Sequence, residues 1–142
     1  MALALPTADG AVIAEVKLII ERIHERRVPY AELFCPMTDE AFAETMQAFT
    51  IRPLGGHLGT VDVEAVSPPV YGRYLFLYST DVDMPQRRFA LRHGTAHVIG
   101  GHVNEVSYLS NRNDFTTHEE RVADLFALAD LVPWYLLDEL RH

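Results

Sequence analysis

Residues 88–97 read RFALRHGTAH, and the helix that this stretch predicts carries the chemistry of the chain. On an α-helix, positions i and i+4 lie one above the other on the same face. His93 and His97 have this spacing, so their two imidazole rings can point at one cation. The same spacing also suits two helical histidines that are hydrogen-bonded within a polar seam. The stretch therefore predicts a helix that either binds a metal ion or buries a polar pair.

The residue between the two histidines is unusual. In the zincin pattern H-E-x-x-H, both histidines bind zinc and the glutamate is the general base. Gly94 occupies the glutamate position here. Zinc alone lowers the pKa of bound water to about 7, and a general base typically adds about a hundred- to ten-thousand-fold in rate. We therefore expect slow hydrolysis or none, unless Glu105 or Glu119, both near in sequence, replaces the base.

Gly94 also carries a structural cost, because glycine inside a helix is less stable than alanine by about 1 kcal/mol. The sequence gives no local reason for a glycine at this position. From the sequence alone, Gly94→Glu is expected to place a carboxylate near the metal and to increase peptidase activity. It should also stabilise the helix by up to about 1 kcal/mol.

Length and charge limit the classes of function. The chain has 142 residues, a net charge of −8 and one cysteine, Cys35. This length suits a single domain over residues 1–142, and the acidic charge argues against a direct nucleic-acid partner. A lone cysteine excludes an intrachain disulfide and fits a cytoplasmic protein. The first residues do not form a convincing signal peptide, and no apolar run is long enough to cross a bilayer.

The periodicity of apolar residues predicts an α+β domain. Helices are expected over residues 11–28, 39–49 (with Thr38 as N-cap), 86–102 and 118–131. Strands are expected over residues 60–66 and 70–80, where the aromatic-rich run suits a central strand. Residues 55–59 are glycine-rich and break any helix, and residues 104–117 are expected to be irregular. The predicted order is two helices, a small antiparallel or mixed sheet, the histidine helix and a C-terminal helix.

A zinc site needs a third protein ligand, and a second motif supplies a candidate. The C-terminal helix contains Glu120, Ala123, Asp124, Phe126 and Ala127, followed by Leu131-Val132-Pro133. Together with residues 88–97, this pattern resembles the ImmA/IrrE family of metallopeptidases. That family pairs an R-F-x-L-x-H-E-x-x-H helix with a later E-x-x-A-[N/D]-x-F-A helix. The close match covers roughly the second half of the chain.

The resemblance implies a zincin-like fold, zinc on His93, His97 and Glu120, and peptide hydrolysis directed at helix-turn-helix repressors. The E-x-x-A-D register selects Glu120 over Glu119. Asp124 lies one turn beyond Glu120, where it is expected either to accept a hydrogen bond from a ligand histidine or to be an exposed acidic residue. His102 is expected to lie at the surface or behind the site, and His118 at the surface.

Three hypotheses follow. The first is a metallopeptidase-like domain with weak or lost activity on a protein or peptide substrate. The second is an inactive module that binds a partner protein through the former substrate cleft, which Arg92 and Gly94 would line. The third is a metal-free structural remnant.

Overall fold

The computed structural model describes residues 10–26, 37–60, 64–67, 69–103, 108–109 and 118–131. In chain order its elements are α1 (Gly10–Arg26), α2 (Asp39–Ala48), β1 (Ile51–Gly56), β2 (Glu64–Val66), β3 (Tyr74–Ser79), α3 (Met84–Ile99), β4 (Tyr108–Leu109) and α4 (His118–Leu131). The α+β class expected from the sequence is confirmed. Cys35 and residues 61–63 of the strand expected over residues 60–66 lie outside the described residues.

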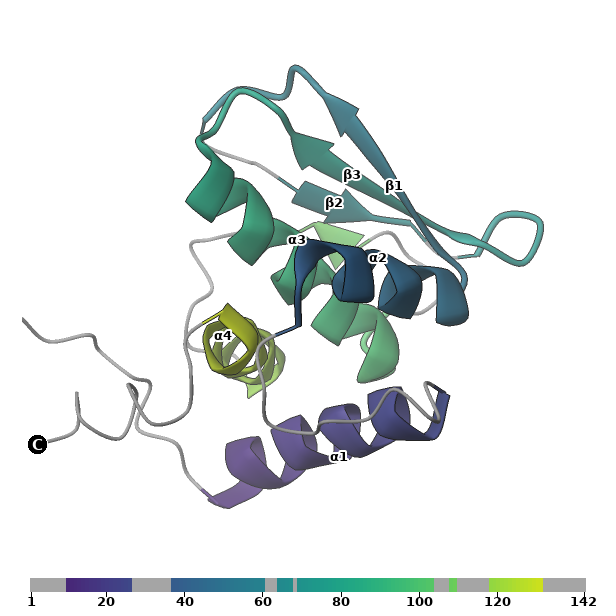
Figure 1. Cartoon of the computed structure of the whole chain (residues 1–142), viewed down its shortest axis with the longest axis vertical. Helices are drawn as coiled ribbons and strands as arrows, with labels where there is room; N and C mark the ends of the chain where they lie inside the picture. Colours follow the sequence, from purple (N-terminus) through teal and green to yellow (C-terminus); the bar gives the residue numbers. More distant parts are fainter. Residues whose placement is uncertain are drawn as a thin grey trace, which may run out of the picture.

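The sheet is mixed, with the strand order β1-β3-β2-β4. β1 runs parallel to β3, whereas β2 runs antiparallel to both β3 and β4. One face of this sheet lies over α2 and α3, and α4 and α1 lie on the far side of these two helices (Figure 1). The histidine helix α3 is therefore enclosed between the sheet and α4.

β1 is the main element that the sequence did not predict, because residues 51–54 were assigned to no element and residues 55 and 56 to a glycine-rich break. Its side chains between Arg52 and Gly55 are exposed, so the strand lacks the alternation of apolar and polar residues that identifies a half-buried strand. The strand forms because its backbone pairs with β3 from Ile51↔Tyr74 to Gly56↔Ser79. Pairing of this kind depends on tertiary structure and leaves little trace in local sequence.

Two expected boundaries were also wrong. The strand expected over residues 70–80 begins only at Tyr74, because Tyr71 and Gly72 have φ values of 50° and 76° and form a turn. The helix expected over residues 86–102 begins at Met84, where the Asp83 side chain accepts a hydrogen bond from the backbone N–H of Gln86. It ends at Ile99, before the two glycines. In contrast, α4 and the Thr38 cap of α2 are confirmed.

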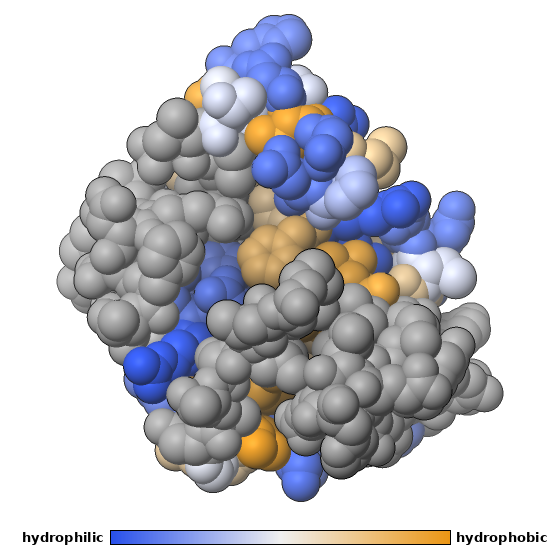
Figure 2. Space-filling view, turned by 90° about the vertical axis from the view of Figure 1, so that its left-hand side faces the viewer, coloured by the Kyte–Doolittle hydropathy of each residue, from blue (hydrophilic) through white to orange (hydrophobic). Residues whose placement is uncertain are grey.

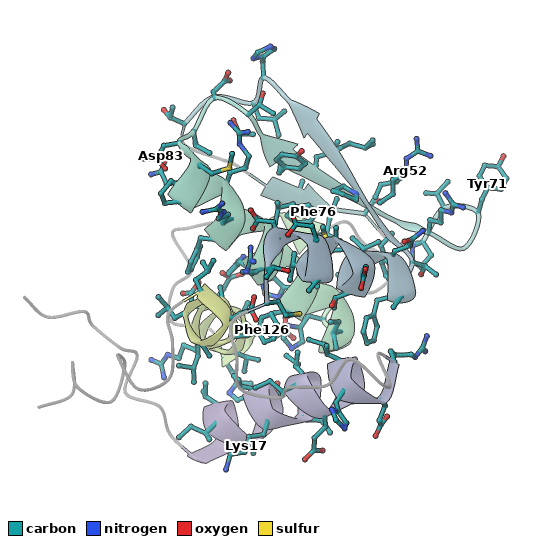
Figure 3. All side chains as sticks on the ribbon, viewed as in Figure 1. Lys17, Arg52, Tyr71, Phe76, Asp83 and Phe126 are labelled. Carbon is teal, nitrogen blue, oxygen red and sulfur yellow. The ribbon has the colours of Figure 1, made fainter. Side chains whose placement is uncertain are left out.

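One core joins the helices and the sheet. The apolar face of α1 contributes Val12, Val16, Ile19 and Ile23, and α4 contributes Val122, Ala123 and Phe126. Phe76 extends from β3 into the interior, whereas Tyr71 stands at the tip of the turn, far from the helices (Figure 3). The aromatic residues of this region are therefore divided between the core and the surface.

A buried ion pair fixes α3 against α4. The guanidinium of Arg92 donates through Nε to Asp130 Oδ2 at 2.6 Å, and only 2% of the Arg92 side chain is exposed. The backbone of Met37 bridges the pair, because its N–H donates to Asp130 and its carbonyl accepts from Arg92. Arg92 also stacks over the ring of Phe42 at 4.4 Å. The hypothesis that Arg92 lines a substrate cleft is therefore wrong, since its charge is used inside the fold.

The visible surface is mixed in polarity. On the face drawn in Figure 2, hydrophilic side chains gather toward the upper end, and a smaller group of apolar side chains lies near the middle. None of the helices in the described ranges is both long and apolar enough to cross a membrane.

Candidate metal centre

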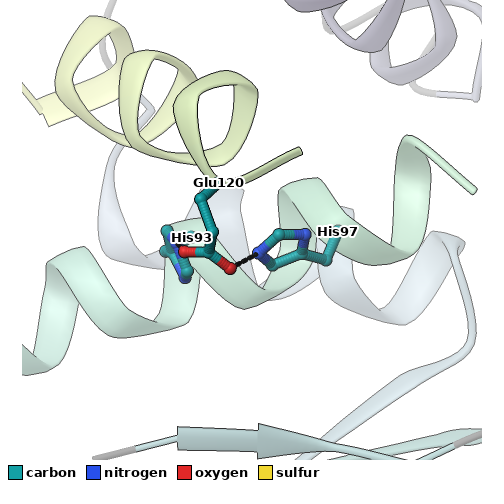
Figure 4. A group of neighbouring side chains, drawn as sticks. All are labelled: His93, His97 and Glu120. Atoms are coloured by element: carbon teal, nitrogen blue, oxygen red, sulfur yellow. Dashed lines mark hydrogen bonds and ion pairs between the residues drawn. The ribbon is translucent and has the colours of Figure 1, made fainter. Parts of the chain in front are cut away.

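His93, His97 and Glu120 meet between α3 and α4. Figure 4 shows the Glu120 carboxylate reaching from α4 toward the two imidazole rings of α3. Glu120 Oε2 lies 2.9 Å from Nε2 of His93, and Glu120 Oε1 lies 3.0 Å from Nε2 of His97. One donor atom from each residue falls within 4.8 Å of the other two. The fold thus brings together the three residues that the two sequence motifs selected.

The three side chains are buried almost completely. The relative exposures of His93, His97 and Glu120 are 2%, 1% and 3%. Glu119, the neighbouring alternative, is exposed to solvent, because adjacent helical residues point about 100° apart. The register that favoured Glu120 over Glu119 agrees with this geometry.

The donor set suits a zinc-class ion. Two imidazole nitrogens and a carboxylate oxygen are common zinc ligands, each at about 2.0–2.2 Å from the metal. Two atoms that share one such ion lie at most about 4.4 Å apart. The two nitrogen–oxygen distances of 2.9 and 3.0 Å meet this limit, and all three donor atoms lie within 4.8 Å of one another. A buried carboxylate is also costly unless positive charge compensates it. This group could therefore hold a metal ion.

Asp124 lies beside the same group. Its Oδ1 is 3.3 Å from Nε2 of His93, and 28% of its side chain is exposed. Nε2 is the nitrogen that faces Glu120, whereas a residue that orients a ligand histidine from behind normally contacts the other ring nitrogen. Asp124 is thus placed on the side of His93 that would face a metal.

Gly94 faces the sheet and not an open cleft. A Cβ atom at this position would lie 1.7 Å from Cε2 of Phe76 and 2.5 Å from Cζ of the same ring. Phe76 is fully buried in β3, so its ring has little room to move. This contact is the local reason for Gly94 that the sequence did not reveal. It contradicts the expectation that Gly94→Glu would simply place a carboxylate beside the metal.

A second polar group lies behind His97. Nδ1 of His102 is 2.9 Å from Nδ1 of His97, and Nε2 of His102 is 3.6 Å from Oε2 of Glu15. His118 Nε2 lies 2.9 Å from Oε1 of the same Glu15. Burial, and then the neighbouring His97, lower the pKa of His102 below its usual value. Sequence reasoning did not single out Glu15, because it is one of several acidic residues on the polar side of α1.

Glu105, one of the two carboxylates considered as a replacement base, lies outside the described residues. Comparisons with protein-family models, with curated proteins and with solved structures each gave no match.

Proposed function

We propose that the chain is a metal-binding domain with a zincin-like site that no longer hydrolyses peptides. In this proposal His93, His97 and Glu120 hold one zinc-class ion, which links α3 to α4. The observation that carries the proposal is the ring of Phe76 packed on Gly94, because it occupies the space in which a glutamate side chain would begin.

The burial of the ligands supports a structural role for the metal. Structural zinc sites are closed, whereas catalytic sites keep one coordination position open for water or substrate. The exposures of 1–3% leave a substrate little access to the three ligands, although a closed site also needs a fourth ligand beside these three. When bound, the ion would supply positive charge that compensates the buried Glu120 carboxylate. The biological role would then be to bind a partner protein, with helix-turn-helix repressors as the class that the motif resemblance suggests.

Metal analysis tests the first half of this proposal. Protein purified without a histidine tag should contain about one zinc-class ion per chain, and His97→Ala or Glu120→Ala should remove it. Glu119→Ala is the matched control, because Glu119 is the exposed neighbour of Glu120 and should leave the metal content intact. A metal content that His97→Ala does not change would refute the assignment.

A peptidase assay tests the second half. We expect the zinc-loaded wild-type chain to leave helix-turn-helix repressor proteins intact under conditions in which an active metallopeptidase cleaves its own substrate. Cleavage of these proteins by the wild-type chain, abolished by a chelator, would show that hydrolysis is retained.

Asp124 provides the one specific reason for a second candidate, a slow metallopeptidase. Its carboxylate is partly exposed and lies 3.3 Å from Nε2 of His93, within reach of a metal-bound water. If cleavage is observed, Asp124→Asn should abolish it without loss of metal. Cleavage that survives Asp124→Asn would exclude Asp124 as the base.

A further inference from the structure

We infer that Asp124 is a fourth protein ligand of the metal site, which leaves no coordination position for water or substrate. This assignment rests on the proposed function, in which His93, His97 and Glu120 are the first three ligands. Three protein ligands with an open fourth position are also the arrangement of a catalytic zinc site. The occupant of the fourth position therefore decides whether the site is structural or catalytic.

Asp124 approaches the nitrogen that His93 would offer to a metal. Its Oδ1 lies 3.3 Å from Nε2 of His93, and Glu120 Oε2 lies 2.9 Å from the same Nε2. Ligand atoms that are about 2.0–2.2 Å from one tetrahedral ion are about 3.3–3.6 Å from each other. The separation of 3.3 Å is therefore the one expected for two neighbouring ligands of a zinc-class ion.

The spacing along α4 gives Asp124 the same direction as Glu120. The two residues are four apart, so they lie one above the other on one face of the helix. That face is turned toward the i, i+4 histidine pair of α3, which both carboxylates approach. Two imidazoles from α3 and two carboxylates from α4 make a complete tetrahedral donor set for a zinc-class ion.

The charges around His93 also favour a cation. Two carboxylates, from Glu120 and Asp124, each have an oxygen within 3.3 Å of the same ring nitrogen. Like charges four residues apart on a helix repel each other, and burial strengthens the repulsion because it lowers the local dielectric constant. A divalent ion bound by both carboxylates would replace this repulsion with attraction.

Asp124 lies where the group meets solvent. The side chains of His93, His97 and Glu120 are 2%, 1% and 5% exposed, whereas 28% of the Asp124 side chain is exposed. Because solvent borders part of this carboxylate, its two side-chain torsions have room to turn toward an ion. As a ligand, Asp124 would fill the position that water takes in a catalytic site. Its carboxylate and the missing general base at Gly94 would then act together against hydrolysis.

Zinc affinity of full-length variants tests the assignment. Asp124→Ala and Asp124→Asn both remove the carboxylate, but asparagine keeps an oxygen that can accept a hydrogen bond. We expect both changes to weaken zinc affinity by more than about 100-fold, the upper end of what losing a residue that only orients a ligand costs. Glu119→Ala removes the same charge from an exposed position of α4 and should keep the wild-type affinity. Affinity is measured by competition with a chromophoric chelator, and thermal unfolding of the zinc-free chains confirms that each variant is folded.

Cobalt(II) in place of zinc reports the fourth position directly, because its visible spectrum depends on its ligands. Azide is the probe, since an added anion binds a metal at an open coordination position. We expect azide to leave the spectrum of the cobalt-loaded wild type unchanged. It should shift the spectrum of cobalt-loaded Asp124→Ala, in which water would replace the carboxylate.

Three results would overturn the assignment of Asp124. These are equal zinc affinity in Asp124→Ala and wild type, an affinity lost in Asp124→Ala but kept in Asp124→Asn, and an azide response of the cobalt-loaded wild type. Cleavage that Asp124→Asn abolishes without loss of metal would make Asp124 the base instead. A wild-type chain that binds no zinc removes the proposed metal function and the fourth ligand together. Zinc bound through His93, His97 and Glu120 with no dependence on Asp124 removes only the fourth ligand.

Discussion

Gly94→Ala should destabilise this protein, although alanine is the better helix former. A new Cβ would lie 1.7 Å from Cε2 of Phe76, 2.5 Å from Cζ and 2.6 Å from Cδ2. Carbon atoms in contact are normally about 3.5–4.0 Å apart, so the ring would have to move by about 2 Å. Overpacking of this kind costs about 1–3 kcal/mol, and such a large displacement places the cost near 3 kcal/mol.

The gain in helix propensity offsets only part of this cost. Replacing glycine with alanine in a helix interior is worth about 1 kcal/mol. We therefore expect the free energy of unfolding to fall by about 2 kcal/mol, measured as a lower urea midpoint with an unchanged slope. Gly10→Ala is the control, because Gly10 lies at the start of α1 and a Cβ there would meet nothing within 4 Å.

A double-mutant cycle isolates the contact itself. Phe76→Leu removes Cε2 and Cζ, the two ring atoms nearest to the new Cβ. The combination of Gly94→Ala with Phe76→Leu should therefore be more stable than the sum of the single effects predicts, by about 0.5–3 kcal/mol. A Gly94→Ala variant that is about 1 kcal/mol more stable than wild type, or strictly additive effects, would refute the reasoning.

Three further predictions concern other contacts. Arg92→Met alone should cost about 3–5 kcal/mol because it removes the guanidinium charge that compensates the buried Asp130 carboxylate, and adding Asp130→Leu should recover part of this loss. Equal stability of the single and double variants would contradict this prediction. In an NMR titration, the hydrogen bond to Asp81 should raise the pKa of His57 above its ordinary value of 6.5, and Asp81→Asn should return it to that value. The contribution of His57 to stability is complete below pH 6.5 and is lost as the pH rises through the raised pKa of His57. The contribution of Asp81 is complete above pH 3.8 and is lost as the pH falls through the lowered pKa of Asp81. Removal of zinc with a chelator should lower the thermal midpoint of the wild type but leave that of Glu120→Ala unchanged, since a ligand that binds only the folded state stabilises it.

The local pattern of residues was enough to predict several parts of the protein. The i, i+4 histidines, together with the Glu120 register, identified three side chains that do meet. The apolar spacing located α1 and α4, because helix periodicity is written in consecutive residues. The fold class also followed from the order of these patterns.

Tertiary structure alone decided the rest. β1 exists through its pairing with β3, so its own side chains gave little sign of it. Arg92 is enclosed by Met37, Phe42 and Asp130, partners that no spacing relates to it. Glu15 approaches His102 only because α1 packs near the end of α3.

Gly94 shows most clearly what local sequence determines and what tertiary packing determines. The sequence identified the missing glutamate, and helix propensity then predicted that glutamate at position 94 would stabilise the helix. Phe76, distant in sequence and on the central part of the sheet, occupies the space that such a side chain would need. Local sequence determines which residues share a helix face, but only packing between distant segments determines whether the space in front of that face is open.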